Sequence, residues 1–291
     1  MDDVPAVLMG KGSPSLKTQF QSKKAGRLQA MLLQDKVIII TGVGPGMGQA
    51  MAKIAAQEGA KVVLAARNQE FLDRVAADIR AAGGQAIGKS TDVSRRADCD
   101  ALVAAAVDAF GRVDGLINSA YVGGEDALFE NGDIERWGQV IDIGALGAAR
   151  MAQAVLEPMK AQGGGAIVNV ATMQSLKPLP GGSISYAVAK GAMATLSRQI
   201  AADVGKYNIR VNCTRMGWLW GEPVRQAVTR IVDATGGSEA DFIAGVASRI
   251  PLGVIPPEEE CARTVLMFVS DYTKMVTGAI LDVNGGEWMA P

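Results

Sequence analysis

The chain has 291 residues and a net charge of −1, with 48% apolar and 20% charged residues. This composition is typical of a soluble globular protein, and the balanced charge favours neither nucleic acid nor an anionic membrane as a partner. The chain contains no histidine, which excludes a Ser-His-Asp triad, a Cys-His pair and an imidazole-ligated metal.

Residues 1–34 precede the first strand-like segment and lack the apolar core of a signal peptide. We expect them to form a loosely ordered arm or an oligomer contact, followed by a single domain over 35–291. No apolar run of about 18 residues is present, so we expect no membrane span. Cys99, Cys213 and Cys261 lie far apart in the sequence and predict buried thiols in a cytoplasmic protein, with neither a disulfide framework nor a metal site.

Short apolar runs alternate with helical periodicity from residue 36 onward, which predicts an α/β fold with a parallel sheet and helices on both faces. Strands are expected at 36–41, 61–66, 86–90, 114–118, 166–171, 209–213 and 278–283. Helices are expected through Met51 and Ile54, from Asn68 to Gly83, and near 95–110, 134–159, 184–205, 223–233 and 257–269. The alternation fails over about 214–256, which indicates a lid or a substrate-binding loop.

A glycine-rich turn follows the first strand and opens the first helix, in Thr41-Gly-Val-Gly-Pro-Gly-Met-Gly48. Glycines here allow a tight turn and close approach of the backbone to a pyrophosphate, and the helix N-terminus supplies free N–H groups. The turn therefore predicts dinucleotide binding by Gly42, Gly44, Gly46, Met47 and Gly48.

The end of the second strand lies where such folds read the ribose of the dinucleotide. Ala66 stands there in place of an acidic residue, and Arg67 follows it with a guanidinium that suits a 2′-phosphate. We therefore expect NADP(H), with NAD(H) as the alternative. Asp92 and Val93 follow the third strand and are expected near the adenine; a helix-capping role for Asp92 is equally open.

Tyr186 stands four residues before Lys190 in Tyr186-Ala-Val-Ala-Lys190. On a helix this spacing places both side chains on one face, one turn apart. A nearby ammonium stabilises the phenolate, so we expect Lys190 to lower the pKa of Tyr186 and to make it a proton-transfer group.

Six motifs in chain order resemble those of a short-chain dehydrogenase/reductase, over residues of about 35 to 291. They are Thr41-Gly-x-x-x-Gly-x-Gly48, Asp92, Asn118-Ser-Ala120, Tyr186-x-x-x-Lys190, Ile209-Arg-Val-Asn212 and Asp282-Val-Asn-Gly-Gly286. The resemblance implies one doubly wound Rossmann-like domain with a seven-stranded parallel sheet, hydride transfer between a nicotinamide and an alcohol or ketone, and a homotetramer or dimer. It also places Asn118, Ala120 and Lys190 at the cofactor.

The resemblance further implies that Tyr186 is the acid/base, that Lys190 is its partner, and that a hydroxyl after the fifth strand holds the substrate oxygen. Thr172 matches that hydroxyl position, and Ser175 is the second candidate. The chain departs from the family at Gly144, where a relay asparagine is usual, and at Tyr121, where a glycine is usual. Gly144 predicts a kink, a water or bulk from a neighbouring element.

Large apolar side chains gather in the segments that wall the substrate in this family. We expect a bulky, mostly apolar alcohol or ketone, such as a steroid, terpenoid or aromatic compound, unless these side chains pack a core or a subunit interface. A non-redox lyase or isomerase and a dinucleotide-binding regulator with weak turnover are the alternative functions. The expected pocket residues are Tyr121, Met173, Ser175, Trp218 and Trp220.

Overall fold

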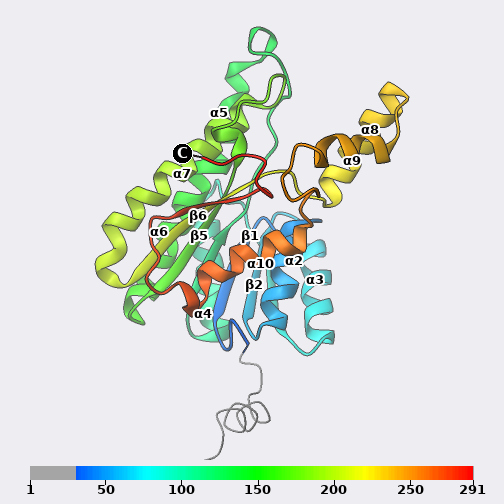
Figure 1. Cartoon of the computed structure of the whole chain (residues 1–291). Helices are drawn as coiled ribbons and strands as arrows, with labels where there is room; N and C mark the ends of the chain where they lie inside the picture. The colour runs from blue at the N-terminus through cyan, green and yellow to red at the C-terminus, as the bar shows by residue number, and fades with distance from the viewer. Residues whose placement is uncertain (1–30, 291) are drawn as a thin grey trace, which may run out of the picture. The chain divides into compact units, whose positions relative to one another are not determined.

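The computed structural model describes residues 31–290, and seven strands of this part form one parallel sheet in the order β3-β2-β1-β4-β5-β6-β7 (Figure 1). The order reverses between β1 and β4, and ligands of such sheets bind outside the carboxyl ends of the strands near that point. The predicted doubly wound, seven-stranded sheet is confirmed. Its strands are β1 (Val37–Thr41), β2 (Lys61–Ala66), β3 (Gln85–Ser90), β4 (Gly115–Asn118), β5 (Gly165–Thr172), β6 (Ile209–Met216) and β7 (Ile280–Val283).

Helices cover both faces of the sheet, as the alternating pattern predicted (Figure 1). Side chains along a strand point alternately to its two sides, so Ile38 and Ile40 enter one core and Val37 and Ile39 enter the other. The first core is closed by α2 (Met47–Gln57), α3 (Gln69–Ala81) and α10 (Glu258–Val269), and the second by α4 (Arg96–Phe110), α6 (Gly147–Ala161) and α7 (Ile184–Val204).

The long helix predicted over 134–159 is interrupted. A short 3₁₀ turn at Ile134–Arg136 leads into α5 (Trp137–Ile141), and a π-helical turn, η3 (Asp142–Leu146), separates α5 from α6. Gly144 lies in this π-helical turn. The predicted irregularity at Gly144 is therefore a widened helical turn and not a break in the chain path.

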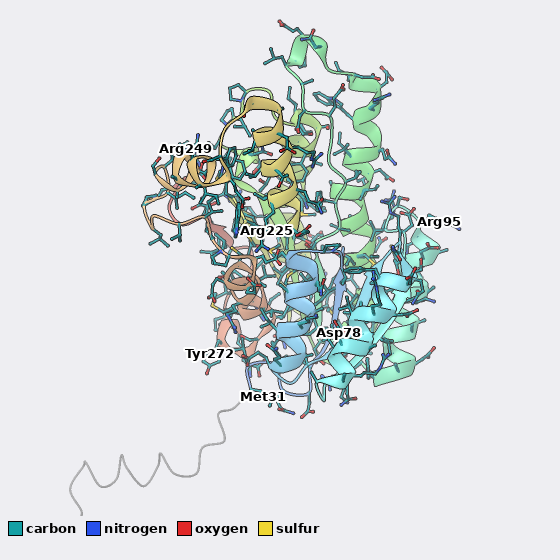
Figure 2. The ribbon with its side chains drawn as sticks, turned by 90° about the vertical axis from the view of Figure 1, so that its right-hand side faces the viewer. Met31, Asp78, Arg95, Arg225, Arg249 and Tyr272 are labelled. Carbon is teal, nitrogen blue, oxygen red and sulfur yellow. The ribbon has the colours of Figure 1, made fainter. Side chains whose placement is uncertain are left out.

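The segment after β6 is more regular than the sequence suggested. The expected helix at 223–233 is α8 (Glu222–Thr235), and a second helix that we did not predict, α9 (Glu239–Ala247), follows it. The two helices form a projection at the carboxyl end of the sheet, which bears Arg225 and Arg249 and lies at the end opposite Tyr272 (Figure 2). A small core of its own supports this projection, built from Trp218, Trp220, Phe242, Ile243, Val246, Ile250 and Ile255.

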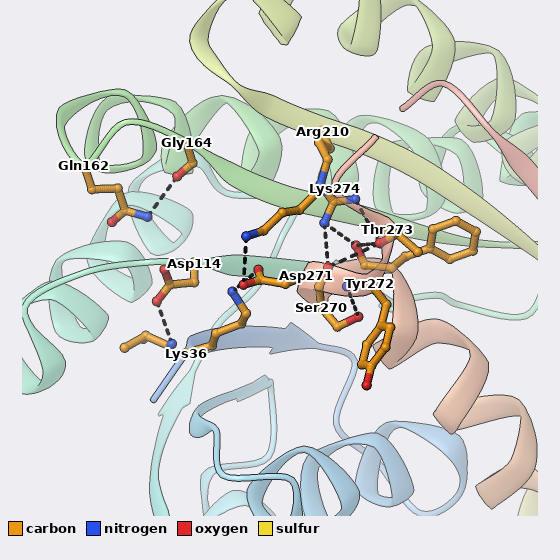
Figure 3. A network of polar contacts seen from close by, with 12 residues as sticks. Lys36, Asp114, Gln162, Gly164, Arg210, Ser270, Asp271, Tyr272, Thr273 and Lys274 are labelled. Atoms are coloured by element: carbon orange, nitrogen blue, oxygen red, sulfur yellow. Dashed lines mark hydrogen bonds and ion pairs between the residues drawn. The ribbon is translucent and has the colours of Figure 1, made fainter. Parts of the chain in front are cut away.

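A polar network ties the amino ends of the strands to the turn after α10 (Figure 3). Lys36, before β1, binds the Asp271 carboxylate at 2.8 Å. Arg210, at the start of β6, donates to the carbonyls of Phe268 (2.8 Å), in the last turn of α10, and of Ser270 (3.2 Å), just after it. These contacts satisfy carbonyl groups that a helix end leaves without partners.

The predicted arm lies mostly outside the described residues. Leu33 is fully buried in the first core, and its backbone N–H donates to the Glu58 carbonyl, so the fold already includes residues that we had assigned to the arm. The three cysteines are buried and free, as predicted. Among the described helices, none is both long and apolar enough to cross a bilayer.

Candidate active site

A cavity of about 1050 Å³ lies at the carboxyl ends of the strands. Its wall runs from the glycine-rich turn after β1, past the ends of β2, β4 and β5, to the start of α8. This is the position that the reversal of strand order predicts for a ligand. The predicted site residues in its wall are Gly42, Gly44, Met47, Gly48, Arg67, Asp92, Val93, Ala120, Tyr121, Thr172, Met173, Tyr186, Lys190 and Trp218.

The glycine-rich turn has the shape of an anion cradle. Gly46 precedes α2 with a φ of 116°, and a Cβ at Gly48 would overlap the Gly42 carbonyl. No side chain caps the first turn of α2, whereas Asn68 caps α3 by accepting from the Phe71 N–H at 3.0 Å. The N–H groups at the start of α2 are thus available to a phosphate, and the turn fits a dinucleotide pyrophosphate.

The adenosine end of the cavity carries one cation and one carboxylate. The exposed Arg67 guanidinium makes no ion pair within the described part of the chain. The Asp92 carboxylate accepts from both the hydroxyl (2.7 Å) and the N–H (2.9 Å) of Ser94, and these bonds lower the pKa of Asp92, with a smaller contribution from Arg67. Asp92 therefore orders the turn after β3 and also contributes to the cavity wall.

Lys190 lies beside Tyr186, as the spacing on α7 predicted. Its Nζ is 5.9 Å from the centroid of the Tyr186 ring and donates to the Val170 carbonyl at 2.7 Å. The side chain is only 2% exposed, and this burial lowers the pKa of Lys190 to about 8. The position of the lysine is thus fixed by α7 and by the end of β5.

The expected direction of the Tyr186 pKa is wrong. Burial raises the pKa of Tyr186 above its usual value, Tyr121 raises it further, and a hydrogen bond with the Thr172 side chain opposes both effects. Removal from water raises the pKa because the phenolate is the form that needs solvation. The site therefore favours the neutral, protonated form of the phenol.

Thr172 ends β5 with its hydroxyl in the cavity wall. The hydroxyl accepts from the Gln174 N–H at 3.3 Å and lies 3.4 Å from the Met216 carbonyl. Ser175, the second candidate, donates its hydroxyl to the Thr172 carbonyl at 2.8 Å and does not contribute to the wall. The geometry favours Thr172 for the substrate oxygen.

An aromatic and thioether surface forms the substrate end. Tyr121 meets Tyr186 edge to face, with ring centroids 5.9 Å apart, and Met173 and Trp218 continue the wall. Trp220 is not part of it, because its ring packs in the small core of the α8–α9 projection with the Arg225 guanidinium 5.7 Å from its centroid.

Two other predicted cofactor residues also lie behind the wall. The buried Asn118 amide donates to the Asn169 side chain at 2.9 Å and to the Ala148 carbonyl at 3.3 Å, so it joins β4 to β5 and α6. Gly46 shapes the turn without lining the cavity. Asn118 and Gly46 therefore shape the backbone behind the cavity wall and do not line the cavity themselves.

Gly144 packs against α7 next to Lys190. A Cβ at this position would come within 3.1 Å of the Ala189 Cβ, which is tighter than ordinary van der Waals contact. A side chain at this position would require Ala189 to shift by a few tenths of an ångström. The interpretation that bulk approaches Gly144 from a neighbouring element is confirmed.

Several polar residues of the wall were missed in the sequence. Some come from loops without periodicity; Lys177 and Glu287, for example, are 110 positions apart and join in an ion pair of 2.9 Å. Arg215 does not line the cavity; it binds Asp282 through two hydrogen bonds of 2.7 and 2.9 Å between β6 and β7. The other missed polar wall residues include Asn68, Asp126, Gln174, Glu222, Gln226, Arg249 and Glu258.

Known proteins resemble this chain in sequence and in fold. Residues 42–287 match the family model described as enoyl-(acyl carrier protein) reductase. The chain is 33% identical over 253 residues to the short-chain reductase protein NovJ of Streptomyces niveus. The aligned region covers 87% of this chain and 94% of NovJ. It is 34% identical over 252 residues to the cis-4-hydroxycyclohexanecarboxylate dehydrogenase of Sinomonas cyclohexanicum, with coverage of 87% and 96%.

The fold comparison points the same way. The L-sorbose reductase of Gluconobacter frateurii, solved with NADPH and L-sorbose, superposes with a TM-score of 0.83 at 29% identity, over 89% of this chain and 98% of that one. Strands β2 to β7, the glycines of the turn and the Tyr186–Lys190 pair all lie within residues 42–287 of the family match. The chain therefore belongs to the short-chain dehydrogenase/reductase family, whose members are oxidoreductases that bind NAD(P).

Proposed function

We propose that this protein transfers a hydride between NADP(H) and a bulky, mostly apolar alcohol or ketone. The observation that carries the proposal is that Tyr186, Lys190 and Thr172 line the same cavity as the glycine-rich turn. A proton donor, a cation and a hydroxyl therefore stand within one site that also fits a dinucleotide phosphate.

A bound nicotinamide supplies or accepts the hydride at its C4 atom. In the direction of reduction, the carbonyl carbon of the substrate gains the hydride and its electron pair, and the carbonyl oxygen takes the proton of Tyr186. Thr172 donates to the same oxygen, and the Lys190 ammonium stabilises the negative charge that develops on the phenol oxygen. Oxidation of an alcohol follows the same steps in reverse.

The preference for NADP(H) rests on Arg67. Its guanidinium is exposed at the cavity wall, at the end of β2, where a bound dinucleotide would present its ribose. We expect Arg67→Ala to weaken NADP binding at least tenfold more than NAD binding. Only NADP carries a 2′-phosphate on its adenosine ribose, and this is the group that we expect the guanidinium to bind. Calorimetric titration with both dinucleotides checks this, and equal losses would contradict the assignment.

The substrate class rests on the apolar wall of Tyr121, Met173 and Trp218. Names of relatives support a ring alcohol or ketone: one is a cis-4-hydroxycyclohexanecarboxylate dehydrogenase and another a 2,5-dichloro-2,5-cyclohexadiene-1,4-diol dehydrogenase. The carbon atoms of such a ring offer apolar surface that aromatic and thioether side chains can contact.

The decisive experiment follows oxidation of NADPH with a panel of ring ketones, and reduction of NADP⁺ with the matching alcohols. We expect turnover in the wild type and a loss of about 10²- to 10⁴-fold in Tyr186→Phe, with dinucleotide binding retained. Substrate consumption without net cofactor change would favour a lyase or isomerase. Tight dinucleotide binding without turnover would favour a regulator, an alternative supported by Gly144 at the position of the family's relay asparagine.

We also propose that the protein is a cytoplasmic homo-oligomer, a tetramer or dimer. β7 forms one edge of the sheet within the described residues. Exposed apolar side chains lie in and near it: Leu281 (37% exposed), Met275 (95%) and Met289 (73%). Exposed apolar side chains beside an open strand edge favour association with a second copy. Light scattering of the purified protein tests this proposal.

A further inference from the structure

A buried carboxylate stands in the wall of the cavity, away from Tyr186 in the sequence and outside every expected motif. Glu287 lies just beyond β7, and its side chain is 3% exposed. One oxygen, Oε1, accepts from Lys177 at 2.9 Å, whereas Oε2 is buried with no hydrogen-bond partner among the described residues. A charged oxygen left without a donor is costly in a folded protein, so Oε2 calls for a ligand.

The lysine of this pair belongs to the substrate end of the site. Lys177 lies in the loop after β5, and its backbone N–H donates to the carbonyl of Met173 at 2.8 Å, one residue after Thr172. The Lys177 side chain remains 34% exposed and lines the cavity together with Glu287. Only one of the three ammonium donors of Lys177 is used by the pair.

The chemistry of the pair selects one kind of group. Lys177 offers a donor and Glu287 Oε2 an acceptor, while their charges cancel. A carboxylate would be repelled by Glu287 and an ammonium by Lys177, whereas a hydroxyl both donates and accepts. The last torsion of a glutamate is broad, so the carboxylate can turn to meet such a donor.

We propose that Glu287 and Lys177 form a hydroxyl-binding subsite that holds a second hydroxyl of the substrate, distant from the carbon that exchanges hydride. This inference rests on the proposed function and narrows its substrate class to bulky alcohols or ketones that carry a further hydroxyl. The competing explanation is a clasp that only holds the chain after β7 against the loop after β5.

Matched ring ketones test the subsite: 4-hydroxycyclohexanone against cyclohexanone, and 6-hydroxy-2-tetralone against 2-tetralone. Dissociation constants are measured by calorimetry on the protein saturated with NADP⁺, and kcat/KM is measured with NADPH. We expect at least one hydroxylated member to bind 10- to 100-fold more tightly than its partner, the range expected for one hydrogen bond to a buried charged group.

For each pair of ketones, the dissociation constant of the plain ketone divided by that of its hydroxylated partner is compared among variants. Glu287→Met should bring it below about threefold, and Glu287→Gln, which keeps the shape and one acceptor, should give an intermediate ratio. Glu157→Gln is the control. Glu157 pairs with Lys160 at the same distance of 2.9 Å on the exposed face of α6, so this substitution should leave the ratio unchanged. If Glu287→Met does not fold, Glu287→Gln and Lys177→Met provide the comparison.

A ratio near one in the wild type, an unchanged ratio in the Glu287 and Lys177 variants, or no binding of either pair would overturn the subsite and favour the clasp. Failure of the proposed function looks different: no ketone would oxidise NADPH, while the calorimetric ratio would still report on the subsite.

Discussion

Proton transfer in this site depends on where water is excluded. Tyr186 and Lys190 stand one helical turn apart, yet burial moves their pKa values in opposite directions, the phenol upward and the ammonium downward. Both shifts favour the neutral form, as expected when a group is removed from water. At neutral pH the phenol retains its proton and most of the lysine remains charged, which is the combination that carbonyl reduction needs.

The lysine shift predicts a pH dependence of stability. The pKa of Lys190 is about 8 in the fold, against an ordinary value of 10.5, so between these values the unfolded chain binds more protons. Stability therefore rises with pH in this window. We expect the free energy of unfolding of the wild type, relative to Lys190→Met, to increase by up to about 3 kcal/mol from pH 7 to pH 10. Urea unfolding of both proteins at the two pH values measures it.

The comparison with Lys190→Met removes the contribution of titratable groups that do not interact with Lys190. The difference in free energy of unfolding between the wild type and Lys190→Met could instead stay constant from pH 7 to pH 10. That result would mean that the lysine keeps its ordinary pKa, and that the ammonium is better solvated than its 2% exposure indicates.

At the scale of elements, the contact between η3 and α7 is the main departure from a regular pair of helices. The π-helical turn places Gly144 against Ala189, the residue before Lys190. Arg150 of α6 reaches back to the Asp142 carboxylate at 2.6 Å and spans this turn. Because Gly144 has no side chain, the backbone of the π-helical turn sets the distance between η3 and Lys190.

A double-mutant cycle tests that contact. Gly144→Ala adds a methyl group within 3.1 Å of the Ala189 Cβ, and Ala189→Gly removes that neighbour. We expect Gly144→Ala to be less favourable in the wild type than in the Ala189→Gly background, with a coupling of roughly 1 kcal/mol. The free energies of unfolding of all four proteins give the value. The same cycle with Gly138→Ala, whose added Cβ meets nothing within 4 Å, should show no coupling.

Periodicity and glycine placement predicted the sheet, the dinucleotide turn and the Tyr186–Lys190 pair, because each depends on residues close in the sequence. The α9 helix was missed because glycines and prolines around 214–256 obscured its periodicity. The Lys177–Glu287 pair could not be foreseen, since it joins two loops 110 positions apart. The direction of the Tyr186 pKa was wrong because it depends on burial, which spacing does not report.

At the scale of the whole molecule, the two ends of the parallel sheet have different tasks. The carboxyl end of the strands carries the cavity, and the amino end carries the network of Lys36, Arg210 and Asp271 (Figure 3). Paired backbone and side-chain groups at the amino end stabilise the fold, while the carboxyl end holds the cavity and, within the described residues, the unpartnered Oε2 of Glu287. Stability and activity should therefore respond to different substitutions.

Arg210 gives the sharpest test of this division. Its guanidinium donates to Thr273 Oγ1 and to the carbonyls of Phe268, Ser270 and Val276, at 2.8 to 3.2 Å, and burial lowers its pKa. Arg210→Met removes all four hydrogen bonds, and only the weaker Thr273 hydroxyl contacts of 3.2 and 3.3 Å remain to the Phe268 and Ser270 carbonyls, so we expect a loss of about 2–4 kcal/mol in the free energy of unfolding. Because the site lies at the other end of the strands, kcat/KM at 25 °C should stay within about twofold of the wild type.

The matched control is Arg112→Met at the same end of the sheet. Arg112 is 51% exposed and pairs with Asp114 at 2.7 Å, so its loss should cost less than about 1 kcal/mol. Tyr186→Phe should show the reverse of Arg210→Met, with turnover lost and the free energy of unfolding nearly unchanged. If Arg210→Met instead reduced kcat/KM strongly at unchanged stability, the amino end of the sheet would be coupled to the cavity and the division of tasks would not hold.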